Sequence, residues 1–333
     1  MINQTCTPYV FPFNIKLNPW YFDLYRKAYQ KVKTFQFDIV VTFGQPMSTH
    51  LAGYKLKKKF PKIKWIAHFS DPWVDNPFNE YNWWTRYINR YYQDLVFYHA
   101  DKLIFTSQET AVLVANQYCD QIISKTEFMP HCFDESFYPQ KLCNVSPYFI
   151  VRYLGNFYGN RQPSYLFNAL KIIPNSELKD VRFEFIGDST LKIEVEAPEL
   201  KNVVTTRPLV NYLDSLKLMS ESNLLLIMDA PTAGISPFLP SKLIDYVGAN
   251  RPIFGITPCG TSQKLIEEMK FLTADPNDHN KVANNLMKMI RHVRSGEIAH
   301  IPNKIRNRFS VATVGNQMSE IFLNMLKDTR FQK

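Results

Sequence analysis

The sequence has 333 residues, a formal net charge of +9 at pH 7, 45% hydrophobic residues and 21% charged residues. This length suits two domains of ordinary size, and the composition is that of a globular chain, which excludes a disordered one. There is no run of about 18 apolar residues. The first residues also lack the charged start and apolar block of a signal peptide. We therefore expect neither a membrane-spanning nor a secreted protein.

The cysteines indicate the cellular compartment, and the net charge indicates the kind of partner. Five cysteines are scattered without the spacing of metal ligands: Cys6, Cys119, Cys132, Cys143 and Cys259. An odd, sparse set suits a reducing cytoplasm. The positive charge favours an anionic partner. Residues 55–64 are the densest basic run, which is either a solvated helix end or a patch for anionic lipid. No nucleic-acid motif accompanies it, so we expect no nucleic-acid partner.

Strand and helix patterns alternate through the first part of the chain. Periodicity predicts helices over residues 18–32, 47–60, 82–100 and 108–118, and strands over residues 37–43, 64–69, 102–105 and 126–129. Alternation of this kind requires crossover connections and gives a parallel sheet. Residues 131–147 have no periodicity and are predicted to form a linker. The first domain is accordingly predicted to span residues 1–145.

The same alternation returns after the linker. Strands are predicted over residues 148–154, 181–186, 203–205 and 223–228 and from residue 252, and helices from residue 163 and over residues 211–220, 240–249, 261–269, 277–293 and 312–326. We expect a second domain over residues 146–310 and a last helix, 311–333, that packs back toward the first domain. The fold class is α/β, with two doubly wound Rossmann-like domains that face a central cleft at the carboxyl ends of their strands.

The stretch from Ser236 to Ile253 contains the sharpest local signals. Pro240 is suited to open a helix, Asn250 can adopt the left-handed position that ends it, and Pro252 prevents its continuation. Lys242 then falls in the first helical turn, where the helix dipole disfavours a cation. A lysine beside a helix N-terminus forms a good anion site. The alternative is a solvated surface lysine.

A second group of polar residues follows the strand at 64–69. His68 and Asp71 lie at its carboxyl end, which faces the expected cleft. Asp71 could orient or deprotonate a hydroxyl group of a substrate, or it could cap the turn that follows. His50 is interpreted as a packing or capping residue. Trp83 and Trp84 are interpreted as aromatic side chains of the core or of an acceptor groove.

Five ordered stretches together resemble the GT-B glycosyltransferases, specifically the family-four type that retains anomeric configuration and uses sugar nucleotides. The stretches are residues 45–53, Trp65–Trp73 with its Asp-Pro-Trp loop, Ala100–Ser107, the glycine turn Tyr153–Arg161, and Pro240–Tyr246 followed by Arg251–Ile253. The resemblance covers the chain from about Phe37 to its end. It implies the GT-B fold with an abbreviated first domain.

The resemblance also implies a set of site residues. Arg161 and Lys242 would clamp the diphosphate in place of a metal ion, so neither a metal nor another cofactor is expected. Asp245 would accept hydrogen bonds from the ribose hydroxyl groups, and Asp71 and His68 would act as the catalytic residues. The complete donor-binding set is Gly155, Asn156, Arg161, Gly187, Ser236, Lys242, Leu243 and Asp245.

The implied function is transfer of a hexose-type sugar from a UDP- or GDP-linked donor to a glycan or lipid-linked acceptor in surface polysaccharide or glycolipid (lipopolysaccharide-type) synthesis. The implied location is the cytoplasm, with peripheral association at the inner face of the cytoplasmic membrane. Two features depart from the family pattern: Pro237 stands where the first of two spaced glutamates is usual, and only residues 1–36 precede the first strand. They favour one alternative, a non-catalytic sugar-nucleotide-binding module. A second alternative, with the same architecture, is a UDP-sugar epimerase.

Overall fold

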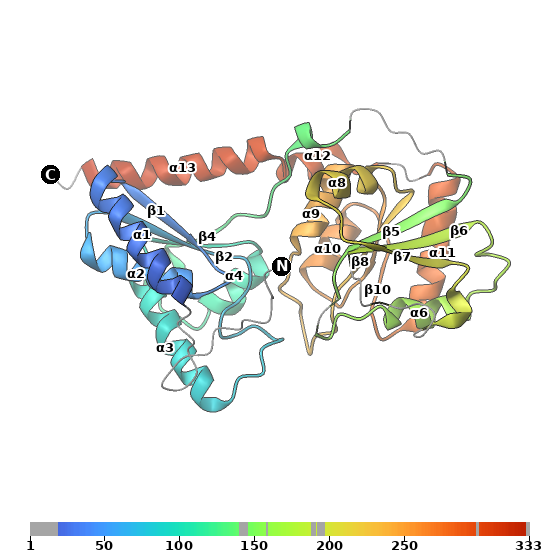
Figure 1. Ribbon diagram of the computed structural model, residues 1–333, viewed down its shortest axis with the longest axis horizontal. Helices are drawn as coiled ribbons and strands as arrows, with labels where there is room; N and C mark the ends of the chain where they lie inside the picture. Colours follow the sequence, from blue (N-terminus) through green and yellow to red (C-terminus); the bar gives the residue numbers. More distant parts are fainter. Residues whose placement is uncertain are drawn as a thin grey trace. The chain divides into compact units, whose positions relative to one another are not determined.

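The computed structural model describes residues 19–139, 146–157, 159–187, 191, 197–297 and 300–330. The chain forms two compact units, of which the first comprises Met1–Pro130 with Asn316–Lys333 and the second comprises His131–Gly315. Figure 1 shows a parallel sheet with helices packed against it in each unit. Within the described ranges, no helix combines the length and the apolar character needed to cross a bilayer.

The first unit is built on a four-stranded parallel sheet in the order β1-β2-β3-β4. Its elements, in chain order, are α1 (Pro19–Phe35), β1 (Ile39–Phe43), α2 (Ser48–Lys59), β2 (Lys64–Phe69), α3 (Trp83–His99), β3 (Lys102–Phe105), α4 (Gln108–Ala115), α5 (Asp120–Ile123) and β4 (Thr126–Phe128). Strands that are consecutive in the chain are neighbours in the sheet. Since such crossovers are right-handed, α2, α3 and α4 cover the same face of the sheet.

Aromatic side chains fill the core of the first unit. The ring of Phe69 in β2 lies 5.3 Å from that of Phe105 in β3 and 5.4 Å from that of Phe97 in α3. The Trp65 side chain is fully buried, and its Nε1 donates a hydrogen bond to Thr42 Oγ1. These contacts fix the register of β2 between its neighbours, which determines where the residues at its carboxyl end are placed.

The second unit contains a six-stranded parallel sheet in the order β10-β9-β8-β5-β6-β7. Its strands are β5 (Phe149–Gly155), β6 (Val181–Gly187), β7 (Val204–Pro208), β8 (Leu224–Met228), β9 (Ile253–Ile256) and β10 (Thr273–Ala274). Its helices are η1 (Glu135–Phe137), α6 (Ser164–Ile172), η2 (Pro198–Leu200), α8 (Tyr212–Ser220), α9 (Ser241–Ala249), α10 (Thr261–Glu268), α11 (His279–Arg294) and α12 (Asn303–Arg308). The order of the strands reverses at β5, so the edge beside its end is a topological switch point.

Helix α9 agrees with the sequence prediction except at its start. Asn250 ends the helix in the left-handed conformation, with φ of 54°, as predicted. Pro240 was expected to be the first helical residue, but it is extended and precedes the first helical residue, Ser241. Tyr246 is fully buried, and its hydroxyl accepts a hydrogen bond from the backbone N–H of Leu154. This bond joins the helix to the end of β5.

The last helix, α13 (Val311–Arg330), begins in the second unit and ends in the first. Gln317 donates a hydrogen bond from Nε2 to the carbonyl oxygen of Phe128, at the end of β4. The grouping of the chain changes between Pro130 and His131. Residue 145, where we expected the first domain to end, and residues 1–18, where we expected an abbreviated start, lie outside the described residues.

Candidate donor-binding site

Gly155 and Gly187 end two neighbouring strands of the second sheet and face each other in register. Both have φ near 130°, a conformation that side chains disfavour. A Cβ atom on Gly155 would lie 2.5 Å from Lys242 Nζ, and one on Gly187 would lie 3.2 Å from Asn156 Oδ1. The two glycines therefore leave the room that Lys242 and Asn156 occupy at this edge of the sheet.

Lys242 extends from the first turn of α9 toward the end of β5. Its Nζ donates a 2.9 Å hydrogen bond to the hydroxyl oxygen of Tyr153 and lies 4.3 Å from the centre of that ring. The ring of Tyr153 stacks on that of Phe157, with 4.7 Å between centroids. Lys242 is thus held by a packed aromatic pair and is not a freely solvated surface lysine.

Arg161 reaches the same edge from the loop after β5. Its Nη2 lies 3.3 Å from Oδ1 of Asp229, the residue that follows β8, and Asp229 is only 4% exposed. Burial, and next the neighbouring charge of Arg161, lower the pKa of Lys242 to about 7, while the charge of Asp229 opposes the shift. Burial raises the pKa of Asp229, with Arg161 opposing. Two cations and one carboxylate thus share a poorly hydrated site.

Asp245 lies one turn after Lys242 on α9 and accepts a 2.9 Å hydrogen bond from the hydroxyl of Tyr212. Burial raises the pKa of Asp245, and this hydrogen bond opposes the shift. Tyr138 donates from its hydroxyl to the backbone carbonyl of Asp245 and so fixes the helix at this point. Asp245 is therefore placed by Tyr212 and Tyr138, and it does not pair with Lys242.

Six of the eight predicted donor-site residues gather around this edge of the second sheet or on the first turns of α9: Gly155, Asn156, Arg161, Gly187, Lys242 and Asp245. The other two are engaged in packing. Ser236 is 3% exposed, and its backbone N–H and C=O pair with the segment from Cys259 to Thr261. The side chain of Leu243 is fully buried in the core. These buried groups therefore give no support to the predicted role of Ser236 and Leu243 in binding a donor.

Sequence reasoning missed three polar partners in this site: Tyr153, Tyr212 and Asp229. Asp229 carried a usable signal, because it is the first polar residue after the apolar strand Leu224–Met228. The same reasoning, polar residues at the carboxyl end of a strand, had identified Asp71. Tyr153 and Tyr212 carried no such signal, because an aromatic residue in a strand or at the start of a helix is usually part of the core.

The two residues predicted to be catalytic lie in the first unit. His68 is in β2 and 6% exposed, and its ring packs 4.9 Å from that of Phe43. Asp71 lies two residues after β2 and is partly exposed. His50, interpreted as a packing residue, is fully buried; its Nδ1 is 2.8 Å from Thr42 Oγ1. Burial, and next the nearby His68, lower the pKa of His50 to about 3, so it is neutral.

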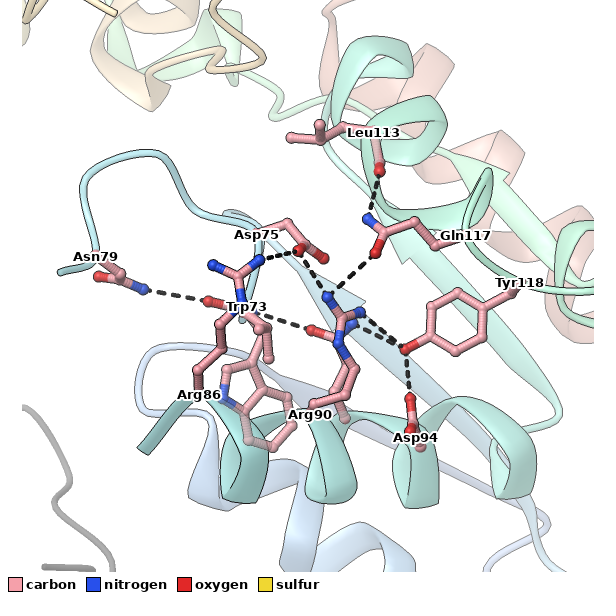
Figure 2. Close-up of polar contacts among 11 residues, drawn as sticks. Trp73, Asp75, Asn79, Arg86, Arg90, Asp94, Leu113, Gln117 and Tyr118 are labelled. Carbon is pink, nitrogen blue, oxygen red and sulfur yellow. Dashed lines mark hydrogen bonds and ion pairs between the residues drawn. The ribbon is translucent and has the colours of Figure 1, made fainter. Parts of the chain in front are cut away.

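A polar network holds the loop that carries Asp71 (Figure 2). Two residues beyond Trp73, Asp75 accepts a 2.7 Å bond from Arg90, and Arg90 also contacts Gln117 and the hydroxyl of Tyr118. Trp73 donates from Nε1 to Asn89 on α3, while Asn79 donates to the carbonyl oxygen of Trp73. The loop after β2 is therefore fastened to α3 by several directed bonds. Among the described residues, no group of three or more His, Cys, Asp or Glu could hold a metal ion.

Comparisons with known proteins agree with this architecture. Residues 2–135 match the family model described as Glycosyltransferase Family 4. No curated protein matches the sequence. A sucrose-phosphate synthase from Thermosynechococcus elongatus is structurally similar with a TM-score of 0.70 at 16% identity, over 96% of this chain and 82% of that one.

Two further solved structures are similar at lower scores. The lipopolysaccharide outer core galactosyltransferase WaaB has a TM-score of 0.59 at 13% identity, over 94% of this chain and 80% of its own. A Listeria monocytogenes protein described as a UDP-N-acetylglucosamine 2-epimerase has a TM-score of 0.59 at 11% identity, over 92% and 80% of the two chains. The chain therefore has the GT-B fold of glycosyltransferases, and residues 2–135 match Glycosyltransferase Family 4.

Proposed function

We propose that the protein transfers a sugar from a nucleoside-diphosphate sugar to an acceptor hydroxyl group. The observation that carries this proposal is the meeting of Lys242 and Arg161 beside Gly155, at the switch point of a parallel sheet. A leaving nucleoside diphosphate gains negative charge as the bond to the sugar breaks. Fixed cations stabilise that charge most where water is excluded.

Each residue of the site suits one part of such a donor. Arg161 offers a planar fork to phosphate oxygens, and Lys242 offers a compact point charge. Together they would supply the positive charge that a metal ion supplies in other transferases, so we propose a reaction without a metal. Asp245, held through its own backbone and by Tyr212, would accept hydrogen bonds from the ribose hydroxyl groups. The donor is then UDP- or GDP-linked, and the transferred unit is of hexose type.

The first unit would serve the acceptor. In this proposal Asp71 orients an acceptor hydroxyl or takes its proton, and His68 supports it from the end of β2. We further propose a retaining reaction on a glycan or lipid-linked acceptor, in surface polysaccharide or glycolipid synthesis at the cytoplasmic face of the membrane. The similarity to a lipopolysaccharide galactosyltransferase and the net charge of +9 support this setting.

Two lysine variants test the donor site. Calorimetry with UDP and GDP, followed by a transfer assay with the corresponding sugar nucleotides, is expected to show binding and turnover by the wild-type protein. Lys242→Ala should abolish both, because it removes one of the two cations. Lys288→Ala is the matched control, since Lys288 is an exposed lysine on α11 of the same unit. Unchanged sugar-nucleotide turnover in Lys242→Ala would refute the diphosphate clamp.

Two other functions have specific support. The residue at the usual glutamate position is Pro237, which is buried and has no carboxylate, and this favours a non-catalytic binding module. That function predicts binding of UDP or GDP without turnover. The similarity to a structure described as an epimerase favours interconversion of UDP-sugars. That function predicts conversion of a UDP-sugar in the absence of any acceptor.

A further inference from the structure

A cavity of about 330 Å³ lies in the second unit, at the edge of the sheet that β10 forms. Its walls come from the loop after β9, from the residues in and around β10, and from helices α10 and α11, both of which pack against β10 (Figure 1). None of the eight residues predicted to bind the donor lines it. Sites for small molecules in proteins have volumes of about 300 to 1,000 Å³, so this cavity has room for one small ligand.

The hydroxyl group of Thr257, the residue that follows β9, lines this cavity and is buried. Thr257 is 2% exposed, and its backbone N–H donates to the carbonyl oxygen of Ala274. Its side-chain Oγ1, however, has no hydrogen-bond partner among the residues that the structure describes. Buried hydroxyl groups are almost always hydrogen-bonded, because an unpaired one loses its hydration without compensation. A ligand with hydroxyl groups would supply the partner that Thr257 lacks.

The other polar groups of the cavity supply mainly hydrogen-bond acceptors. Glu267 Oε1 accepts hydrogen bonds from Thr273 at 2.6 Å and from Gln263 at 3.1 Å, which hold the carboxylate in place, and Oε2 is a further acceptor. Asn285 donates from Nδ2 to the carbonyl oxygen of Thr273, so its Oδ1 is also an acceptor. Asp275 adds a second carboxylate to the lining. A lining rich in acceptors requires a ligand rich in donors, and hydroxyl groups are such donors.

The charges and the apolar part of the lining narrow the class of ligand further. The two carboxylates, Glu267 and Asp275, disfavour an anion, whereas the ammonium group of Lys281 disfavours a cation. Phe271 and Leu272 give the cavity an apolar wall. A wall of this kind suits the C–H face of a sugar ring, while the polar groups fix the orientation of its hydroxyl groups. A neutral ring that carries many hydroxyl groups therefore matches the whole lining.

We propose that this cavity is a second ligand site of the protein, which binds one neutral monosaccharide. Thr257 and Glu267 bond hydroxyl groups of the sugar, and the apolar wall contacts its ring. Helix α10 connects this site to the donor site: Ser262, in its first turn, donates a 3.2 Å hydrogen bond to the carbonyl oxygen of Phe238, in the loop that precedes α9. The sugar is thus bound beside the segment that carries Lys242, in a site of its own.

Alkylation of Cys259 by iodoacetamide, followed by mass spectrometry, tests the proposal without any sugar nucleotide, so its outcome does not depend on the proposed transferase activity. Cys259 is an exposed free thiol that lines the cavity. The probes are glucose, galactose, mannose and N-acetylglucosamine. At about ten times its dissociation constant, a sugar that covers the thiol should slow its alkylation about tenfold. Cys119, an exposed cysteine of the first unit, is the internal control and should react at an unchanged rate.

Thr257→Val removes the buried hydroxyl group and nearly keeps the shape of the side chain. It should weaken sugar binding roughly fivefold to tenfold, as judged from the protection of Cys259. The free energy of unfolding should not fall, because this hydroxyl makes no bond within the described part of the protein. Thr106→Val is the matched control: Thr106 is fully buried in the first unit, and its Oγ1 donates to the carbonyl oxygen of Ser70. This variant should be less stable than the wild type but should show unchanged protection of Cys259.

Two further comparisons separate the cavity from other sites and other ligands. Lys242→Ala, which removes a cation of the donor site, should keep the protection of Cys259, and its loss there would assign the sugar to the donor site. Ethanolamine and glucose 6-phosphate, which carry a charge, should protect Cys259 less than the neutral sugars do. The proposal is overturned if none of the four sugars protects Cys259, if Thr257→Val is protected as well as the wild type, or if a charged probe protects best.

Discussion

The carboxyl edges of the two sheets differ in the charge of their buried titratable side chains. In the first unit the edge beside β1 and β2 contains His50 and His68, and His50 is kept neutral by burial. In the second unit the edge beside β5 and β8 contains Lys242, Arg161 and Asp229, which interact as charges. Burying charge is costly unless it is paired, whereas a neutral imidazole needs only a hydrogen bond. The buried cations of the second edge thus bear a cost that an anionic ligand would offset, whereas the buried neutral His50 of the first edge bears no such cost.

The largest expected effect is on the charged edge. Asp229→Ala leaves Arg161 and Lys242 close together without their buried carboxylate, so the free energy of unfolding should fall by about 3–5 kcal/mol. Asp180→Ala is the control, because it breaks an exposed ion pair with Arg294 in the same unit and should cost at most about 1 kcal/mol. The measurement is urea unfolding followed by circular dichroism.

The positions of the tryptophans allow unfolding of the first unit to be followed separately from that of the second unit, which contains Asp229. All five tryptophans lie between residues 20 and 84, in the first unit, so their fluorescence reports on that unit alone. In Asp229→Ala the fluorescence transition should keep its midpoint, and saturating UDP should restore more stability than it adds to the wild type. Equal losses in Asp229→Ala and Asp180→Ala would show that burial of charge does not distinguish this edge.

The second effect concerns the neutral His50 at the edge of the first sheet and depends on pH. The pKa of His50 is about 3 in the folded protein and 6.5 ordinarily, so between these values the unfolded chain holds a proton that the folded chain lacks. Stability contributed by neutral His50 is therefore present above pH 6.5 and is lost as pH falls toward 3, by up to about 1.4 kcal/mol per pH unit.

Tryptophan fluorescence during urea unfolding measures this dependence in the correct unit. Wild-type protein should lose about 2 kcal/mol between neutral pH and about pH 5. His50→Asn should lack this contribution to the slope, while His99→Asn, which changes an exposed histidine at the end of α3, should keep it. Identical slopes in the wild type and His50→Asn would mean that the first edge tolerates a charge and that the contrast between the two edges is not electrostatic.

The contrast between the edges also shows what the sequence could predict. The GT-B fold was predicted from alternating elements and ordered motifs, and it is confirmed. The left-handed Asn250 was predicted from local turn chemistry. The pairing of Lys242 with Arg161 was implied by the resemblance to the GT-B glycosyltransferases, and the two cations do lie close enough to affect each other.

What the sequence could not supply was the partner of each charge. Asp229 is distant from Arg161 in the chain, and Tyr153 is distant from Lys242 and looks like a core residue. Only the fold brings each pair together. Trp83 and Trp84 were left open between the core and an acceptor groove for a related reason; both are exposed, so the core alternative is wrong. Aromatic residues at helical spacing mark one face of a helix, but periodicity alone does not say whether that face meets a core or the solvent.

A third, smaller effect concerns Lys242 at the charged edge, because the charge of this lysine depends on pH. Burial lowers the pKa of Lys242 to about 7, whereas a bound diphosphate requires the ammonium form. Above about pH 7 the free site must take up a proton to bind, so the affinity for UDP should fall by up to tenfold per pH unit, or about 1.4 kcal/mol. Calorimetry between about pH 6.5 and about pH 8.5 measures this dependence.

Lys242→Arg is the matched variant, because a guanidinium stays charged over this whole range. It should bind more weakly than the wild type at neutral pH, owing to its different shape, but its affinity should change much less with pH. Any titration of UDP itself is common to both proteins and cancels in the comparison. Equal pH slopes in the two proteins would show that Lys242 is already charged in the free site and that burial does not govern this edge.

The smallest effect lies one helical turn away, where a neutral group meets a carboxylate. Tyr212 donates its hydroxyl to Asp245 Oδ1, and the pKa of Tyr212 is raised to about 12, mainly by burial and next by Asp245. Tyr212→Phe should lower the affinity for UDP by about 1 kcal/mol or less, because it removes a single hydrogen bond that orients the carboxylate. Affinity for the 2′-deoxyribose analogue of UDP should change less, since Asp245 then has fewer ribose hydroxyl groups to bind. Equal losses for the two nucleotides would mean that Tyr212 stabilises the start of α8 and that Asp245 does not contact the ribose.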